Sequence, residues 1–442
     1  MNESSLIGKI SINGQVTVQS PLLIGDGAGE TTENFRDIHV LKNRDGKPFI
    51  PATSLCGVLR DWLENISPEH MTKIFGDQKE MQSSIQLRDI ELEDGKIISR
   101  DGVRIDSLTG TGVDGGKYDY EAIERGATGN LYLLINLRQC HSIEDVSEIV
   151  ARLLKKLQDG IRLGALTGKG FGLVTAENLT ANLYDFRDGK DVIAWLSGND
   201  SAKKIQPSTE KNSASENDFV VNANFSFNSS FIVRNYNISA DDKEKNISAV
   251  TLRSRADFVI PGTSLKGILR HRAEYIFGKL GIDQKFLEEL MGNSTPDKKI
   301  KSRFIVAESY VAPKNFSEFE HTRNKIDRFT GGTLQGTLFT TKPAYQKNFD
   351  EPTLKIHFEI RNAKDFEAGL AIFLLRDLWL SRVAIGGEKS IGRGTVTGLN
   401  AEINFKGKTY KLGAGGKILG NNKSELENFA TALKNFAGGD NA

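Results

Sequence analysis

The stretch IPATSLCGVLR at residues 50–60 returns as IPGTSLKGILR at residues 260–270, with eight of eleven positions identical. One repeat of a motif this long indicates that the chain contains two copies of a single unit. The copies lie too far apart for the short period of a solenoid. Because the chain has 442 residues, each copy is long enough to bury a core of its own.

The composition is that of a globular protein, with 38% hydrophobic and 26% charged residues. The two cysteines, Cys56 and Cys140, belong to no Cys/His cluster with zinc spacing, and so few thiols favour a reducing compartment. The first residues, MNESSLIGKI, lack the basic and apolar regions of a signal peptide, and no stretch approaches about eighteen apolar residues. We therefore expect a cytoplasmic protein without a membrane partner.

The net charge of +1 neither favours nor excludes a polyanion partner, because binding depends on where the charges lie. Their distribution is uneven. Between Arg253 and Arg303, eleven lysines and arginines face six acids. This excess is compatible with a solvated helical face and with a nucleic-acid surface, and the cations inside the repeated motif favour the second.

The apolar pattern predicts the same order of elements in both copies, namely strand, helix, strands, strand, helix and strand. In the first copy, residues 10–18 alternate as a strand or as a hairpin turning at Asn13-Gly14. A helix follows Pro51, with Thr53 or Ser54 as its expected cap, and runs to about residue 66. A buried strand follows at 130–137 and an amphipathic helix at 143–157. This order is that of a split βαβ unit, so we predict an α+β fold of two tandem ferredoxin-like, RRM-like domains with mostly antiparallel sheets.

Composition also suggests the domain boundaries. Residues 197–217 are polar and rich in Ser, Asn and Lys, which is typical of a flexible linker. We predict a first domain at 1–196, a linker at 197–217, a second domain at 218–430 and a loose tail at 431–442.

The repeated helix start carries residue types suited to phosphate. Backbone N–H groups at a helix start, with Thr and Ser hydroxyls, bind anions, and glycine in the first turns lets a sugar-phosphate backbone approach. An arginine one turn later supplies a counter-charge. The alternative is that the hydroxyls only cap the helix and the glycines only ease its packing. The predicted contacts are Thr53, Ser54, Gly57 and Arg60 in the first copy, and Thr263, Ser264, Lys266, Gly267 and Arg270 in the second.

Two further motifs also occur twice. VRIDSLTG at 103–110 matches NKIDRFTG at 324–331, each with a cation, Ile-Asp and Thr-Gly. Such a loop could place apolar side chains between stacked bases while Arg104 or Lys325 meets phosphate, although an ordinary turn has the same pattern. GALTGKGFG at 164–172 matches GGEKSIGRG at 386–394. The latter pair fits neither a Walker A sequence nor a dinucleotide fingerprint, so we expect no nucleotide cofactor, but Lys169 and Arg393 could accompany a backbone lying close under RNA.

Taken together, these motifs resemble the RAMP superfamily of CRISPR proteins, and specifically the backbone subunits of type III effector complexes, in a tandem fusion like that of the type III-D branch. The combination of the IPG-TSLKG helix start with a glycine-rich loop near the end of each copy is fairly specific, although the first copy has Ala52 and Cys56 where the family usually has glycine and lysine. The resemblance covers nearly the whole chain. It implies RAMP domains with thumb hairpin insertions, which the second motif fits. It also implies guide (crRNA) RNA, complementary target RNA and neighbouring CRISPR effector subunits of a filament-like complex as partners.

The resemblance also implies a cutting residue. In that family an aspartate in the loop before the repeated helix cleaves target RNA with a divalent metal, Mg²⁺ or Mn²⁺, and Asp37 matches its place and would hold the metal. Asp26 is the second candidate in the same loop. Aligning Leu41 with Leu252 puts Ser248 opposite Asp37, so the second copy would depend on Asp241 or Asp242 upstream. Arg253 and Arg255, which follow this loop, are expected to bind RNA.

Three functions remain open from the sequence. The first is a guide-binding backbone subunit that is also an endoribonuclease acting on target RNA. The second is an RNA-binding scaffold whose loop acids do no chemistry. The third is a guide-processing endoribonuclease, which commonly uses a histidine in general acid-base catalysis. The six histidines do not fall at matching positions in the two copies, but His39 lies near Asp37.

Overall fold

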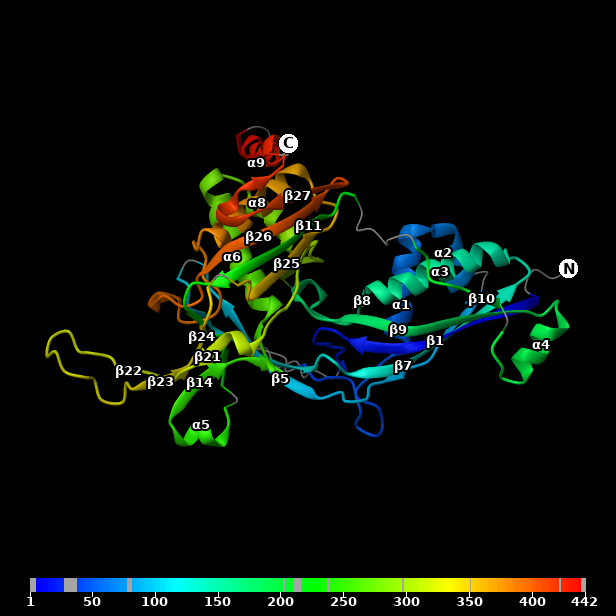
Figure 1. Cartoon of the computed structure of the whole chain (residues 1–442), viewed down its shortest axis with the longest axis horizontal. Coiled ribbons are helices and arrows are strands. Elements are labelled where there is room, and N and C mark those ends of the chain that lie inside the picture. The colour runs from blue at the N-terminus through cyan, green and yellow to red at the C-terminus, as the bar shows by residue number, and fades with distance from the viewer. Residues whose placement is uncertain are drawn as a thin grey trace. The chain divides into compact units, whose positions relative to one another are not determined.

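The computed structural model describes residues 5–27, 38–77, 82–107, 109–201, 203–209, 216–236, 238–295, 298–349, 351–420 and 423–438. The chain divides into two compact units (Figure 1). The first comprises Met1–Thr167 and Phe171–Ser213, and the second comprises Gly168–Gly170 and Ala214–Ala442. Each unit has a hydrophobic core of its own.

An antiparallel sheet in the order β10-β9-β1-β7-β3 underlies the first unit, with β8 paired to β9. Its strands are β1 (Leu6–Val18), β3 (Ile85–Leu87), β7 (Thr128–Arg138), β8 (Ile161–Arg162), β9 (Leu173–Asp185) and β10 (Lys203–Lys204). Alternate residues of β1, from Ile10 to Val18, are buried, as the apolar alternation predicts. The strand continues through Asn13 and Gly14, where its register with β9 shifts, so there is no hairpin at this point.

Helices cover one face of this sheet (Figure 1). They are α1 (Ala52–Ile66), α2 (Pro68–Phe75) and α3 (Ile143–Asp159), and α4 (Gly189–Leu196) follows β9. Leu55, Leu59 and Leu63 form the buried stripe of α1. A short pair, β2 (Phe49–Ile50) with β4 (Ile90–Glu91), precedes the long hairpin of β5 (Ile97–Ile105) and β6 (Gly112–Ile123), which we call the first hairpin.

The second unit repeats this plan. Its main sheet has the order β19-β25-β11-β26-β27-β28, and all of its pairs are antiparallel. The strands are β11 (Phe219–Phe227), β19 (Phe304–Val306), β25 (Leu354–Ile360), β26 (Val396–Phe405), β27 (Lys408–Leu412) and β28 (Ile418–Leu419). The order β9-β1-β7-β3 of the first unit matches β26-β11-β25-β19 of the second, which confirms the ferredoxin-like α+β fold in both.

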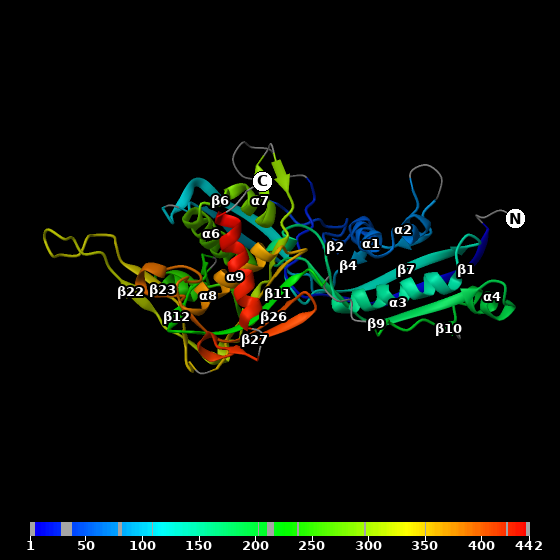
Figure 2. The same ribbon diagram turned by 90° about the horizontal axis from the view of Figure 1, so that it is seen from above.

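The helices of the second unit are α5 (Ala240–Glu244), α6 (Gly262–Leu280), α7 (Gln284–Met291), α8 (Asp365–Trp379) and α9 (Lys423–Gly438). Helices α6 and α8 pack on the main sheet and on each other, and α9 packs on α8 (Figure 2). The insertions form small sheets from β12 (Ser230–Phe231), β13 (Arg234–Asn235), β14 (Ile247–Thr251), β15 (Arg253–Ser254), β16 (Asp257–Ile260), β17 (Asn293–Thr295), β18 (Lys298–Ile300), β20 (Ser309–Val311), β21 (Phe316–Glu318), β22 (His321–Arg323), β23 (Phe339–Lys342) and β24 (Ala344–Gln346). Strands β22 and β23 with the segment between them project from the unit in both views, and we call them the second hairpin.

Two boundary predictions need correction. Lys203 and Lys204, inside the predicted linker 197–217, pair with β9 as strand β10. Residues 431–438, inside the predicted tail, continue α9, and Leu433 is fully buried with Leu426 and Phe429. The helical spacing of these three apolar residues was the signal that composition alone missed.

Candidate nucleic-acid interface

The repeated motif forms the first turns of α1 and α6. Both helices begin directly after a proline, Pro51 or Pro261, and neither has a side-chain cap. The expectation that Thr53 or Ser54 caps the helix is therefore wrong, because α1 starts earlier and both residues lie within its first turn. At its start, the Ala52 N–H donates to Asp89 Oδ1 at 2.7 Å, so an acid of the chain itself occupies this helix terminus.

The two glycines of the motif face open space. A Cβ atom added at Gly57 or at Gly267 would have no neighbour within 4 Å. The alternative that these glycines ease helix packing is thereby excluded. Glycine within a helix costs roughly 0.5–1 kcal/mol relative to alanine, so the fold loses stability here without any gain from its own packing.

Each glycine belongs to a stripe along its helix. Thr53, Gly57 and Arg60 are spaced at i, i+4 and i+7 on α1, and all three are exposed. Their counterparts on α6 are Thr263, Gly267 and Arg270, which are half-buried. We call each set a glycine stripe. It presents a hydroxyl, a bare backbone and a cation in one line, which suits a sugar-phosphate chain.

Two other predicted contacts on these helices differ in their surroundings. Lys266 is only 5% exposed, and its Nζ donates to Ser302 Oγ at 2.6 Å and to Phe304 O at 2.8 Å. Burial lowers the pKa of this ammonium to about 7. The burial of Lys266 does not support a direct RNA contact. Ser54 and Ser264 are half-buried on the sides of their helices.

The tips of the two hairpins have the same turn. In the first, the Asp106 N–H donates to Thr111 O and the Gly110 N–H donates to Asp106 O, both at 2.9 Å. In the second, Asp327 N–H donates to Gly332 O at 2.8 Å and Gly331 N–H to Asp327 O at 2.9 Å. Gly110 and Gly331 have φ values of 68° and 69°. The Ile-Asp-x-x-Thr-Gly pattern is therefore one turn used twice.

The hairpins expose apolar side chains beside cations. Phe329, at the tip of the second hairpin, is 99% exposed. Lys325 and Arg104 are exposed on the second and first hairpins, respectively. Further exposed apolar residues lie on the two hairpins, namely Val103, Ile105, Val113, Ile326, Leu334, Leu338 and Phe339. Exposed apolar side chains that gather on one element are typical of a surface that binds a partner.

The last glycine of each glycine-rich loop is required by a close backbone contact inside its own unit. A Cβ atom at Gly172 would lie 1.9 Å from Leu163 O, and one at Gly394 would lie 1.9 Å from Ile385 O. Both residues also have positive φ, 77° and 78°. These glycines are required by the fold itself, so they are not evidence for RNA lying on the loop. Lys169 in the first loop is half-buried, and burial lowers the pKa of its ammonium.

Arg393 is part of a buried ionic network and not of the surface. It is 3% exposed, and its Nε donates to Glu388 Oε2 at 2.8 Å. Glu388 also accepts from Arg323 at 2.6 Å and from Arg234 at 3.3 Å. Burial alone would raise the pKa of this carboxyl, but the three arginines, Arg323 foremost, hold it below its usual value. The prediction that Arg393 contacts RNA is not supported, because its guanidinium is used inside the fold.

The loop expected to cut RNA is described only in part. Asp37 lies outside the described residues. Asp26 is exposed, and its N–H donates to His39 O at 3.2 Å. The Glu121 carboxylate, on the return strand of the first hairpin, accepts from Val40 N–H at 3.0 Å and lies 3.6 Å from His39 Nδ1. Sequence reasoning missed Glu121, because no local pattern links it to a loop some eighty positions earlier.

The strand ladders confirm the alignment of the two loops. Ile38 pairs in parallel with Tyr120, and Ala249 pairs in parallel with Thr341. Position 37 therefore corresponds to Ser248, whose hydroxyl donates to Thr340 O at 2.9 Å. By the same register Glu121 corresponds to Lys342, so the acid beside the first loop is replaced by a cation in the second copy.

The other two candidate acids of the second loop, Asp241 and Asp242, lie in the first turn of α5. Asp242 accepts from Ser239 Oγ at 2.8 Å and lies 3.4 Å from Lys342 Nζ, and its pKa is lowered chiefly by the Ser239 hydroxyl. Asp241 is exposed in the first turn of α5. Within the described part of the chain, no three His, Cys, Asp or Glu side chains are placed to hold a metal ion.

The remaining predicted cations follow this loop in the second unit. Arg253 pairs with Glu318 at 2.5 Å and lies over the Phe258 ring at 4.2 Å. Arg255 is exposed, with a positive φ of 51°.

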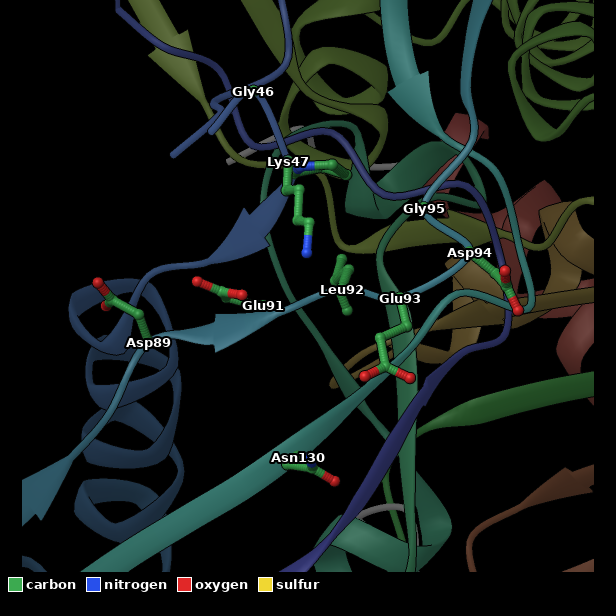
Figure 3. A pocket seen from close by; sticks show the side chains of 10 residues that line it. Gly46, Lys47, Asp89, Glu91, Leu92, Glu93, Asp94, Gly95 and Asn130 are labelled. Atoms are coloured by element: carbon green, nitrogen blue, oxygen red, sulfur yellow. The ribbon is translucent and has the colours of Figure 1, made fainter. Parts of the chain in front are cut away.

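A hollow of about 720 Å³ lies beside β4 in the first unit (Figure 3). Acidic side chains dominate its lining, and Lys47 points into it from the opposite side (Figure 3). The acids are Asp89, Glu91, Glu93 and Asp94. Their negative charge disfavours phosphate, so this hollow is not part of the interface.

The family comparison agrees with the division of the chain into two similar units. The profile of the RAMP superfamily matches residues 15–175 and 223–397, one region in each unit. The chain belongs to the RAMP superfamily. No curated protein sequence matches it. In the described part of the chain, no helix is long and apolar enough to cross a membrane.

One similar solved structure is described as Type III-B Cmr-beta bound to cognate target RNA, determined by cryo-EM. The matched chain is 15% identical with a TM-score of 0.31, and the match covers 39% of this chain and 61% of the other. The match thus spans less than two thirds of that chain, and a TM-score this low identifies no function.

Proposed function

We propose that the chain is a guide-RNA-binding backbone subunit of a type III CRISPR RNA-targeting complex. The observation that carries this proposal is the pair of glycine stripes, each with an unpacked glycine between a hydroxyl and an arginine. Each unit binds one of two adjacent guide segments, with Thr53, Ser54, Gly57 and Arg60 in the first and Thr263, Ser264, Gly267 and Arg270 in the second. The partners are the guide RNA, the complementary target RNA and neighbouring effector subunits, and the complex acts in the cytoplasm.

The two hairpins contact the duplex that the guide RNA forms with the target RNA. Arg104 and Lys325 meet phosphates, while exposed apolar residues such as Phe329 enter between bases. The two identical tip turns support equal roles for the two units. Lys169, Arg253 and Arg255 are further cations that would contact RNA.

We further propose that the first unit cleaves the target RNA at Asp37. Two carboxylates support it, Asp26 in this loop and Glu121 on the adjoining strand β6, because they are oxygen donors of the kind that Mg²⁺ or Mn²⁺ prefers. When bound, such an ion supplies stabilisation of the charge that develops on the attacked phosphate. In the second unit the corresponding residue is Ser248, so we assign no cut to it unless Asp241 supplies the acid.

The pair of His39 and Glu121 favours a second mechanism. At 3.6 Å from Glu121, an exposed imidazole can transfer protons to and from RNA without a metal. A chelator separates the two mechanisms, because it stops cleavage that needs a divalent ion and leaves cleavage by His39 unchanged. If the complex binds target RNA but cuts it neither with Mg²⁺ nor with chelator present, the chain is a scaffold whose loop does no chemistry.

Replacing both stripe glycines tests the proposed function. We expect Gly57→Ala with Gly267→Ala to raise stability by about 1 kcal/mol, because alanine favours the helix. The same change is expected to weaken RNA binding about tenfold, because a methyl group separates the helix from the sugar-phosphate backbone. Thermal unfolding and fluorescence anisotropy with labelled guide RNA measure the two effects. The matched control is Gly278→Ala, a glycine of α6 whose added Cβ also meets nothing. The proposal fails if the stripe variant is more stable and binds guide RNA as tightly as the unchanged chain.

A further inference from the structure

A second cationic surface lies on the helices of the second unit. Asp377 of α8 is fully buried, and three arginines share its carboxylate. Arg272 Nε lies 2.6 Å from Oδ2, while Arg376 and Arg382 lie 3.2 Å and 3.4 Å from Oδ1. One negative charge is thus set against three positive charges.

The excess charge lies at the surface. Side-chain exposure is 24% for Arg272, 47% for Arg376 and 52% for Arg382. Of the three arginines, Arg272 lies nearest to the Asp377 carboxylate and has the least exposed side chain. Its positive charge therefore compensates the buried negative charge. The guanidinium groups of Arg376 and Arg382 then remain close together at the surface, with Arg376 lying over the Phe373 ring at 4.7 Å, and an anion would stabilise this arrangement.

An exposed aromatic ring adjoins these arginines. Tyr275 is 52% exposed, and Arg272 lies over its ring at 4.6 Å. Lys279 lies 5.7 Å from the same ring. Glu274, the neighbouring acid on α6, is paired with Arg270 instead. We call Arg272, Tyr275, Lys279, Arg376 and Arg382 the arginine patch.

The arginine patch and the glycine stripe occupy different sides of α6. At about 100° per residue, Thr263, Gly267 and Arg270 fall within one narrow sector of the helix. Arg272, Tyr275 and Lys279 fall in another, roughly 150° away. The buried residues Leu265, Leu269, Ala273 and Phe277 lie between the two, so the stripe and the patch flank the core on opposite sides.

In the described part of the first unit, the positions that match Arg272, Tyr275 and Lys279 carry other residue types. By the register of the repeated motif, Arg272, Tyr275 and Lys279 correspond to Trp62, Asn65 and Glu69. Trp62 packs against the core, and Glu69 pairs with Lys73. The three patch residues on α6 are therefore not repeated in the first unit.

We propose that the arginine patch binds single-stranded RNA at a surface separate from the glycine stripes. Arg376 and Arg382 hold phosphates, and a base stacks on Tyr275, whose ring accepts any base. The exposed aromatic ring favours RNA over an acidic protein segment, because carboxylates alone would need only the cations. This site adds to the proposed function and does not depend on the glycine stripes.

The test measures binding of a fluorescein-labelled oligouridine to the full chain across salt concentrations. Arg376→Ser with Arg382→Ser keeps Arg272 on Asp377. We expect this variant to bind about tenfold more weakly and to lower the salt slope by about 1.4, since each phosphate contact on a single strand contributes about 0.7. The loss should add to that of the glycine variant, because the two surfaces are separate.

A second pair of variants keeps the test independent of the arginines. Tyr275→Leu should weaken binding about tenfold, and Tyr275→Phe should restore it, because phenylalanine stacks as tyrosine does. Unchanged affinity and slope in all of these variants would overturn the proposal. It is also overturned if polyglutamate displaces the oligouridine at equal charge and Tyr275→Leu has no effect, which would assign the patch to an acidic protein. If the patch variants bind RNA more weakly while the glycine variant binds it as tightly as the unchanged chain, the patch proposal is supported and the glycine-stripe proposal is not. The two proposals can therefore fail separately.

Discussion

Asp37→Ala is expected to remove one cut in the target RNA, slowing it by about 10³-fold while leaving RNA affinity unchanged. The physical reason is that a carboxylate in this loop either holds the divalent ion or orients the attacking ribose hydroxyl, and alanine does neither. The measurement is a time course of end-labelled target RNA with the assembled complex and Mg²⁺, with products mapped to the nucleotide.

The second copy supplies the matched control. Ser248 occupies the corresponding position, so Ser248→Ala should leave the cutting pattern unchanged. If every product persists in Asp37→Ala at the normal rate, the catalytic assignment is wrong and the scaffold alternative gains support. A cut lost only in Asp241→Ala would assign chemistry to the second unit as well.

Glu388→Ala is expected to destabilise the second unit by about 3 kcal/mol. Removing one partner of a buried ion pair leaves its charge uncompensated, and Arg393 is almost completely buried. Because Arg323 belongs to β22, the loss should act first on the base of the second hairpin. Hydrogen exchange of the β22 and β23 amides, followed by mass spectrometry on the full chain, measures this local opening.

The first copy again suggests the control. By the register of the glycine loops, Glu388 and Arg393 correspond to Leu166 and Phe171, and Phe171 is fully buried. Glu388→Leu with Arg393→Phe imports this apolar pair, and we expect it to recover most of the stability that Glu388→Ala loses. If the single and double variants open equally, the network is not what holds the hairpin base.

The order of elements could be predicted from the sequence because the chain repeats it. Alternation along residues 10–18 and helical spacing after Pro51 and Pro261 each suggested one element, and the second copy confirmed the assignment within the same sequence. The same repetition identified the turn at Asp106 and Asp327 before its hydrogen bonds were known.

The burial of Lys266 could have been predicted from its position along the helix. It lies three residues before Leu269 and four after Gly262, on the buried side of α6, so its burial follows from the helical period. The basic character of the motif predicts a surface cation at this position, but the helical period places it on the buried side.

Arg393 could not have been placed from its local sequence. It lies between two glycines, a setting that suggests phosphate, and apart from Glu388, five residues earlier, its partners come from distant segments. Glu388 adopts a positive φ of 57°, and Ser230 and Tyr345 bond to the guanidinium from other strands. Only the folded chain brings these groups together.

The central claim is that both glycine stripes lie against guide RNA. Photocrosslinking tests it most directly, with p-azidophenylalanine introduced at Thr53 or at Thr263 in the assembled complex and at Glu427 of α9 as the control. We predict crosslinks from Thr53 and Thr263 to two separate guide segments and none from Glu427. Crosslinks from neither stripe, in a complex that still holds its guide, would contradict the account.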